Sequence, residues 1–284
     1  MEWFLADNVN PGSRKHTAGW LHPVFAFFLG MLCSPVLGFY GSDYLDATNV
    51  VRKELRVGEQ YTNVMLGYFI IGYHTVLIIV RVFTMGFPLL YEQLWACNLA
   101  MPLAAVGIVT GRPIMVGAAC LAVAIDQILW YVDVFSRICF GRWSVGVAKY
   151  MDWPETTLVT KLTSFHHLWF LPLCLWHLRS TKCGMPIESF ILSSFGVCVM
   201  SGVTRLVVPF KIKKSTLSHR KKSDGDGLQY SNVNMTHEFW KDIPVALLHK
   251  MDGAKWYFYI PYLMVVYNIL HWPFYILMKL LTEA

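Results

Sequence analysis

Cys97, His166 and His167 are side chains capable of nucleophilic chemistry that lie inside long apolar runs, in the stretches LWACNLAM and KLTSFHHLWFLPLCLWH. A cysteine attacks an ester carbonyl as its thiolate, and a neutral imidazole beside it can take the thiol proton and return it to the leaving alcohol. Asn98 or a backbone N–H could stabilise the oxyanion. The same residues could equally be a small core cysteine and histidines that form hydrogen bonds between helices.

The two histidines are adjacent in the sequence, so the spacing limits what they can do together. Neighbouring positions on a helix point about 100° apart. We therefore expect only one of His166 and His167 to face Cys97.

The composition places these residues in a membrane protein. Of the 284 residues, 55% are hydrophobic and only 15% are charged, and the mean hydropathy is +0.44. Soluble domains of this length are more polar. No soluble module carries a basic face, so we expect no nucleic-acid binding.

Seven apolar runs are long enough to cross a bilayer, which requires about 20 residues per helix. They are continuously apolar and do not alternate as barrel strands do, so the fold class is all-α, a polytopic membrane protein with seven transmembrane helices in one bundle. We expect a single integral membrane domain over 1–284. The predicted helices are 20–40, 61–80, 93–110, 113–131, 157–178, 187–210 and 256–278.

The distribution of Lys and Arg predicts the orientation. The side that holds the N-terminus carries 15 of these residues and the opposite side 7, which favours a cytoplasmic N-terminus. Much of the excess lies in a basic loop, 211–231, that we expect to be flexible. Asn234-Met235-Thr236 matches the N-glycosylation pattern on the same side, but a pattern of three residues is common by chance, and the charge argument is preferred.

Other polar residues give further expectations. Asp126 and Arg205 are candidates for an ion pair between helices, and Asp252 is a candidate cap for the last helix. The seven cysteines include no CxxC pair, so we expect neither a disulfide framework nor a zinc site, and no cofactor or metal.

Three segments resemble the YwaF-like family of integral membrane proteins. They are YEQLWACNLAMPLAAVGIV, LTSFHHLWFLPLCLW and NVNMTHEFWKDIPVALLHKMDGAKWYFYIPYL, and within the third the best match is ALLHKMDGAKWYFYI, residues 246 to 260. The resemblance covers most of the chain from about residue 60 and includes the seven-helix layout.

The resemblance implies an activity. An animal branch of that family is implicated in acyl transfer to ether phospholipids, with a membrane-embedded cysteine and histidine as catalytic residues. Cys97 would be that cysteine and His166 or His167 that histidine. The implied partners are membrane lipids, a phospholipid and a lysophospholipid.

Two alternatives remain open from the residues alone. A non-catalytic scaffold or receptor-like protein would use all these polar groups as hydrogen bonds between helices. A haem-binding electron-transfer protein would use histidines on facing helices, and His74, His166, His167 and His271 supply enough of them.

Overall fold

The computed structural model describes the protein over most of its length. The described residues are 21–47, 64–85, 87–153, 156–208, 211–213, 223–224, 228–230, 233–239 and 246–283.

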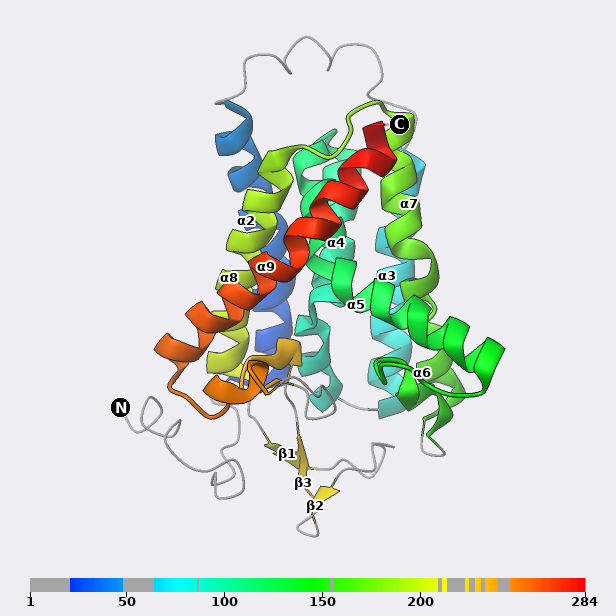
Figure 1. The fold of residues 1–284 in the computed structure, drawn as a ribbon, viewed down its shortest axis with the longest axis vertical. Helices are drawn as coiled ribbons and strands as arrows, with labels where there is room; N and C mark the ends of the chain where they lie inside the picture. Colours follow the sequence, from blue (N-terminus) through cyan, green and yellow to red (C-terminus); the bar gives the residue numbers. More distant parts are fainter. Residues whose placement is uncertain are drawn as a thin grey trace.

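Helices dominate the structure (Figure 1), and within the described residues five of them are long and apolar enough to cross a membrane. Many of their large apolar side chains are exposed, among them Met65 and Phe83, as expected for surfaces that face lipid. The chain is therefore a multi-pass membrane protein. The five helices are α2 (Pro23–Ala47), α3 (Val64–Met85), α5 (Pro113–Phe140), α8 (Ile187–Val207) and α9 (Trp256–Glu283).

Shorter helices occupy the two remaining predicted segments, 93–110 and 157–178, and parts of the loops. They are α4 (Ala96–Val109), α6 (Leu158–Thr163) and α7 (His166–Ser180), together with the 3-10 helices η4 (Phe87–Leu94), η5 (Lys149–Asp152), η6 (Val233–Met235) and η7 (Leu248–Met251).

The predicted helix 157–178 is not continuous. It breaks between α6 and α7 at Ser164 and Phe165. The Ser164 hydroxyl donates to the Thr160 carbonyl (2.8 Å) and the Thr163 hydroxyl to the Val159 carbonyl (2.8 Å). Such side-chain bonds to the backbone compete with helical bonds and bend helices. The break places His166 at the first position of α7.

Helix α5 is longer than the predicted 113–131 and ends at Phe140. The reason is Asp133, which is fully buried and accepts backbone N–H bonds from Val145 (2.7 Å), Gly146 (2.9 Å) and Ala148 (2.9 Å). A carboxylate satisfied by backbone donors is stable inside a protein. Asp133 therefore sits within the helix and fixes the following loop against it.

Helix α5 is also the centre of the bundle and packs against α4, α7, α8 and α9. Gly117 permits its close approach to α8, because a Cβ there would lie 2.3 Å from the Ser189 Oγ. Small residues bring membrane helices together in this way. The largest apolar core cluster is built around α4, α5 and α7 and includes Met101, Leu121 and Phe170.

The expected flexible loop 211–231 contains three short antiparallel strands: β1 (Lys211–Lys213), β2 (Ser223–Asp224) and β3 (Leu228–Tyr230), in the order β1-β3-β2. The rest of that loop lies outside the described residues. Figure 1 shows the sheet at the same end of the bundle as the start of α2.

Two expected roles for polar residues are wrong. Asp252 does not cap α9, because its Oδ1 accepts from the Phe239 N–H (2.9 Å) and its Oδ2 pairs with the His249 Nδ1 (2.7 Å). Arg205 does not pair with Asp126; its guanidinium donates to the carbonyls of Thr236 and Ala254. Both residues fasten the connection between α8 and α9.

Candidate functional site

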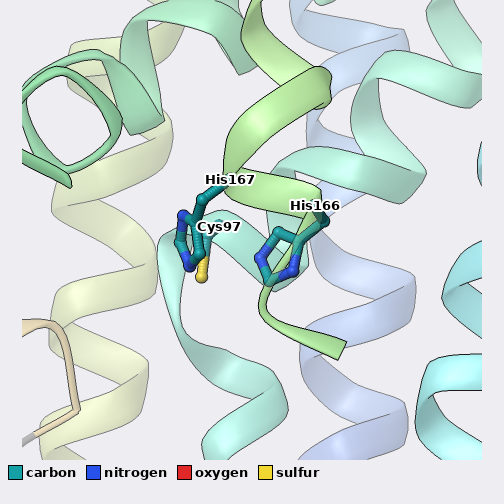
Figure 2. Close-up of side chains that lie close together, drawn as sticks. All are labelled: Cys97, His166 and His167. Carbon is teal, nitrogen blue, oxygen red and sulfur yellow. The ribbon is translucent and has the colours of Figure 1, made fainter. Parts of the chain in front are cut away.

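Cys97, His166 and His167 converge at one place in the bundle. One ligand atom from each, the sulfur or a ring nitrogen, lies within 4.8 Å of the other two. Figure 2 shows the sulfur of Cys97 beside the ring of His167, with the ring of His166 next to them. The expected proximity of Cys97 to a histidine is confirmed.

The expectation that only one histidine faces Cys97 is wrong. The two imidazole centroids are 4.1 Å apart, and both rings belong to the cluster. The divergence of about 100° applies to the Cα–Cβ bonds, and a ring extends well beyond them. The ring of His166 points toward the preceding residues of the helix break, because its Nδ1 forms a 2.7 Å hydrogen bond with the Thr163 carbonyl.

That hydrogen bond fixes the tautomer of His166. A carbonyl oxygen can only accept, so the ring proton is on Nδ1 and Nε2 carries a lone pair. The side chain is 2% exposed, and Nε2 has no hydrogen-bond partner in the described structure.

His167 has a different environment. Its ring stacks on Trp130, with centroids 5.9 Å apart and an interplanar angle of 24°. Its Nδ1 lies 3.9 Å from the Asp126 Oδ2. Covalent catalysis uses a nucleophile, a base beside it and a group that orients the base. The Cys97 thiol, the His167 imidazole and the Asp126 carboxylate have the chemistry for these three roles.

Cys97 is held in position by a residue far away in the sequence. The Asn234 Oδ1 accepts from the Ala96 N–H and its Nδ2 donates to the Leu94 carbonyl, both at 2.7 Å. These bonds join the end of η4 to the start of α4. Asn234 itself has φ +54°, a left-handed conformation that asparagine tolerates better than most residues. Because both amide atoms are engaged, the side chain is a clamp and a poor glycosylation acceptor.

Asn98 is placed beside Cys97 but is also engaged. Its Nδ2 donates to the Glu92 carbonyl (2.9 Å), and the side chain is 2% exposed. This bond ties η4 to α4 and gives Asn98 a structural role. In the first turn of α4 the Ala96 N–H is held by Asn234, and the N–H groups of Asn98 and Leu99 donate to the Trp95 carbonyl (both 3.0 Å). The candidate backbone donor for an oxyanion in that turn is therefore the Cys97 N–H.

A cavity of about 1030 Å³ opens onto the cluster, at the upper end of the about 300–1,000 Å³ usual for ligand sites. Its wall includes Cys97, both histidines and apolar side chains of α8 and α9 such as Phe195 and Leu263. Polar groups also reach it. Tyr150 of η5 is one, and burial raises the pKa of its hydroxyl, so Tyr150 stays protonated and can donate a hydrogen bond.

Arg81 is the buried cation of the cavity wall. Its side chain is 8% exposed, and its Nε donates to the Thr163 Oγ1 (2.9 Å). No ion pair joins it to a carboxylate in the part of the chain that the structure describes. A buried cation without an anion is costly, so the cavity is suited to a ligand with a negative group. Sequence reasoning missed this role, because the predicted helix 61–80 ends just before Arg81 and assigns it to a loop, whereas α3 continues to Met85.

The remaining histidines do not join the cluster. In the described residues, the group with metal-ligand spacing contains Cys97, His166 and His167 and leaves out His74 and His271. The His271 Nδ1 is bonded to the Tyr267 carbonyl (2.8 Å), and its ring stacks on Tyr267.

No family model, curated protein or solved structure matches this chain. The resemblance to the YwaF-like family therefore stays a hypothesis, and the functional argument depends on the site.

Proposed function

We propose that this chain is a membrane-embedded acyltransferase in which Cys97 is the nucleophile and phospholipid and lysophospholipid are the substrates. The observation that carries the proposal is the convergence of a thiol and two imidazoles on the wall of a large cavity between membrane helices. The resemblance of the three sequence segments to the YwaF-like family supports the same chemistry.

His167 is the base in this proposal, because a carboxylate lies beside its Nδ1. The imidazole takes the Cys97 proton, the sulfur attacks the ester carbonyl of the donor phospholipid, and the carbon–oxygen ester bond breaks. The imidazolium then gives its proton to the leaving alkoxide, which departs as a lysolipid. The first products are a thioester on Cys97 and a lysolipid.

The second half reverses these steps with an acceptor. A lysophospholipid hydroxyl loses its proton to His167 as its oxygen attacks the thioester, and the thiolate leaves and regains that proton. The acceptor has gained the acyl group and the enzyme is restored. In both halves the oxyanion faces the start of α4, where the Cys97 N–H and the positive end of the helix dipole stabilise negative charge.

Arg81 is positioned to bind the lipid phosphate. Guanidinium groups bind phosphate through paired, charge-assisted hydrogen bonds, and the Nε bond to Thr163 leaves the terminal nitrogens for such a ligand. Apolar wall residues such as Phe195 would accommodate an acyl chain.

The proposal includes a topology of seven crossings with a cytoplasmic N-terminus. The 14-residue α4 spans about 21 Å at 1.5 Å per residue, less than a bilayer core of about 30 Å. We infer that η4 and α4 together form one crossing, and α6 with α7 another. The positive-charge distribution supports the orientation.

The test is transfer of a labelled acyl chain from phospholipid to lysophospholipid by purified protein freed of metal. Cys97→Ala should abolish turnover, and Cys97→Ser should leave little, because a hydroxyl is much less acidic than a thiol. His167→Gln should reduce turnover by about 10²–10⁴-fold, the usual contribution of a general base. Cys174→Ala, which changes a fully buried cysteine of α7 outside the cluster, is the matched control and should stay active. An active Cys97→Ala protein would refute the assignment.

A further inference from the structure

The proposed mechanism leaves one feature of the cluster unexplained. Acyl transfer needs a single imidazole base, and His167 supplies it. His166 nevertheless presents an Nε2 lone pair with no hydrogen-bond partner among the described residues, in a side chain that is 98% buried. Burying a polar group without a partner is unfavourable, so such a lone pair indicates a ligand.

We propose that Cys97, His166 and His167 form a binding site for one Zn²⁺ ion. One thiolate and two imidazoles are ligands that zinc prefers, whereas Ca²⁺ and Mg²⁺ prefer oxygen ligands. Zinc bonds of about 2.0–2.3 Å place tetrahedral ligand atoms about 3.5 Å apart. The three atoms here lie within 4.8 Å of one another. Side-chain rotations that move the ligand atoms by about 1 Å bring them to the spacing that zinc requires.

The surroundings provide what a metal-binding histidine requires. Zinc-ligating imidazoles usually donate their second ring N–H to a carbonyl or carboxylate, which fixes the ring and the tautomer. The Thr163 carbonyl does this for His166 at 2.7 Å. The Asp126 carboxylate lies on the Nδ1 side of His167 at 3.9 Å. Asp126 also balances the single positive charge that remains when one thiolate binds Zn²⁺.

The fourth coordination position faces the cavity, since all three ligands line it. Three protein ligands with one open position is the arrangement of zinc sites that accept water or another small ligand.

Zinc binding has a consequence for catalysis, which rests on the proposed function. The thiol gives up its proton to solvent as the sulfur binds the metal, and the zinc–sulfur bond weakens the sulfur as a nucleophile. The His167 nitrogen that serves as the base is bound to zinc in the same state, so it cannot carry a proton to the leaving alkoxide and the acylation step is blocked. Zinc-bound and acylating protein are therefore exclusive states, and Zn²⁺ acts as a reversible inhibitor.

The test measures metal binding without lipid. Full-length protein in detergent is stripped with a chelator, titrated with Co²⁺ as a spectroscopic substitute, and separately loaded with Zn²⁺ and analysed for metal content. We expect one zinc per chain, and a Co²⁺ spectrum with a thiolate-to-metal charge-transfer band and the intense visible bands of tetrahedral cobalt. Cys97→Ala should remove the charge-transfer band, and His166→Gln should weaken binding at least tenfold. Asp126→Asn should weaken it by about 10–100-fold, as loss of an outer-sphere partner does.

Cys174→Ala and His177→Gln are matched controls, because both residues are buried on α7 and lie outside the cluster. Both should bind metal as the wild type does. Size-exclusion profiles establish that each variant is folded. The proposal is overturned if the wild type binds no zinc, if cobalt shows no thiolate band, or if Cys97→Ala and His166→Gln bind as tightly as the controls.

The two proposals fail separately. Zinc binding by a protein that transfers no acyl group after chelation contradicts the enzyme and supports the metal site. Transfer by a protein that binds no zinc contradicts the metal site and supports the enzyme.

Discussion

Replacing Asn234 by Ala tests whether the clamp positions Cys97. The substitution removes the bonds to the Ala96 N–H and the Leu94 carbonyl, both 2.7 Å long. Each intramolecular hydrogen bond contributes about 0.5–1.5 kcal/mol, so the free energy of unfolding should fall by about 1–3 kcal/mol. Without the clamp the start of α4 can move, and a displacement of about 1 Å at a catalytic group can reduce turnover about 10²-fold.

The assay combines thermal unfolding in detergent with acyl transfer at a temperature where the variant remains folded. Asn268→Ala is the matched control. Its side-chain amide also makes two bonds: the Nδ2 donates to the Met264 carbonyl within α9, and the Oδ1 accepts from the Ser194 hydroxyl of α8. We expect similar losses of stability in the two variants and a large loss of turnover in Asn234→Ala alone. Normal turnover in folded Asn234→Ala, or equal loss in Asn268→Ala, would refute the positioning role.

Three further predictions follow from the fold and the cavity. Arg81→Gln should raise KM for phospholipid about 10- to 100-fold, because it removes a hydrogen bond to a charged group, which contributes about 1.5–3 kcal/mol of binding free energy. An unchanged KM would exclude Arg81 as the phosphate ligand. Asp252→Ala should destabilise the folded protein by about 1.5–3 kcal/mol through the lost bonds to Phe239 and His249, and loss of turnover at normal stability would contradict that structural role. A membrane-impermeant maleimide applied to the cytoplasmic face of sealed membranes should label the exposed Cys139 directly and the exposed Cys183 only after permeabilisation, and the reverse pattern would invert the proposed orientation.

The sequence predicts where helices form more reliably than where they end. Each predicted segment contains a helix, because continuous apolar runs leave few other structures in a bilayer. The extension of α5 to Phe140 depends on Asp133 reaching backbone donors in the following loop. The break before α7 depends on local bonds from Thr163 and Ser164 to the backbone. Hydropathy alone carries neither signal.

The site was predicted in part. Cys97 and His166 stand out because ionisable side chains are costly within lipid, but their convergence is a tertiary property. Asn234 belongs to an N-glycosylation pattern, and no feature of the neighbouring sequence indicates that its side-chain amide contacts the start of α4. Cys97 and the two histidines come from α4 and α7, which are far apart in the sequence. The spacing of cysteines along the chain therefore could not predict that they form one cluster.

The most direct test of the central claim is detection of an acyl group on Cys97. Metal-free protein is incubated with a phospholipid carrying one labelled acyl chain, without acceptor, and its intact mass is measured. The account predicts a mass increase of one acyl group in place of a hydrogen, located at Cys97, removed by hydroxylamine or by lysophospholipid and absent from Cys97→Ala. Transfer activity without any adduct on Cys97, or an equal adduct in Cys97→Ala, would contradict it.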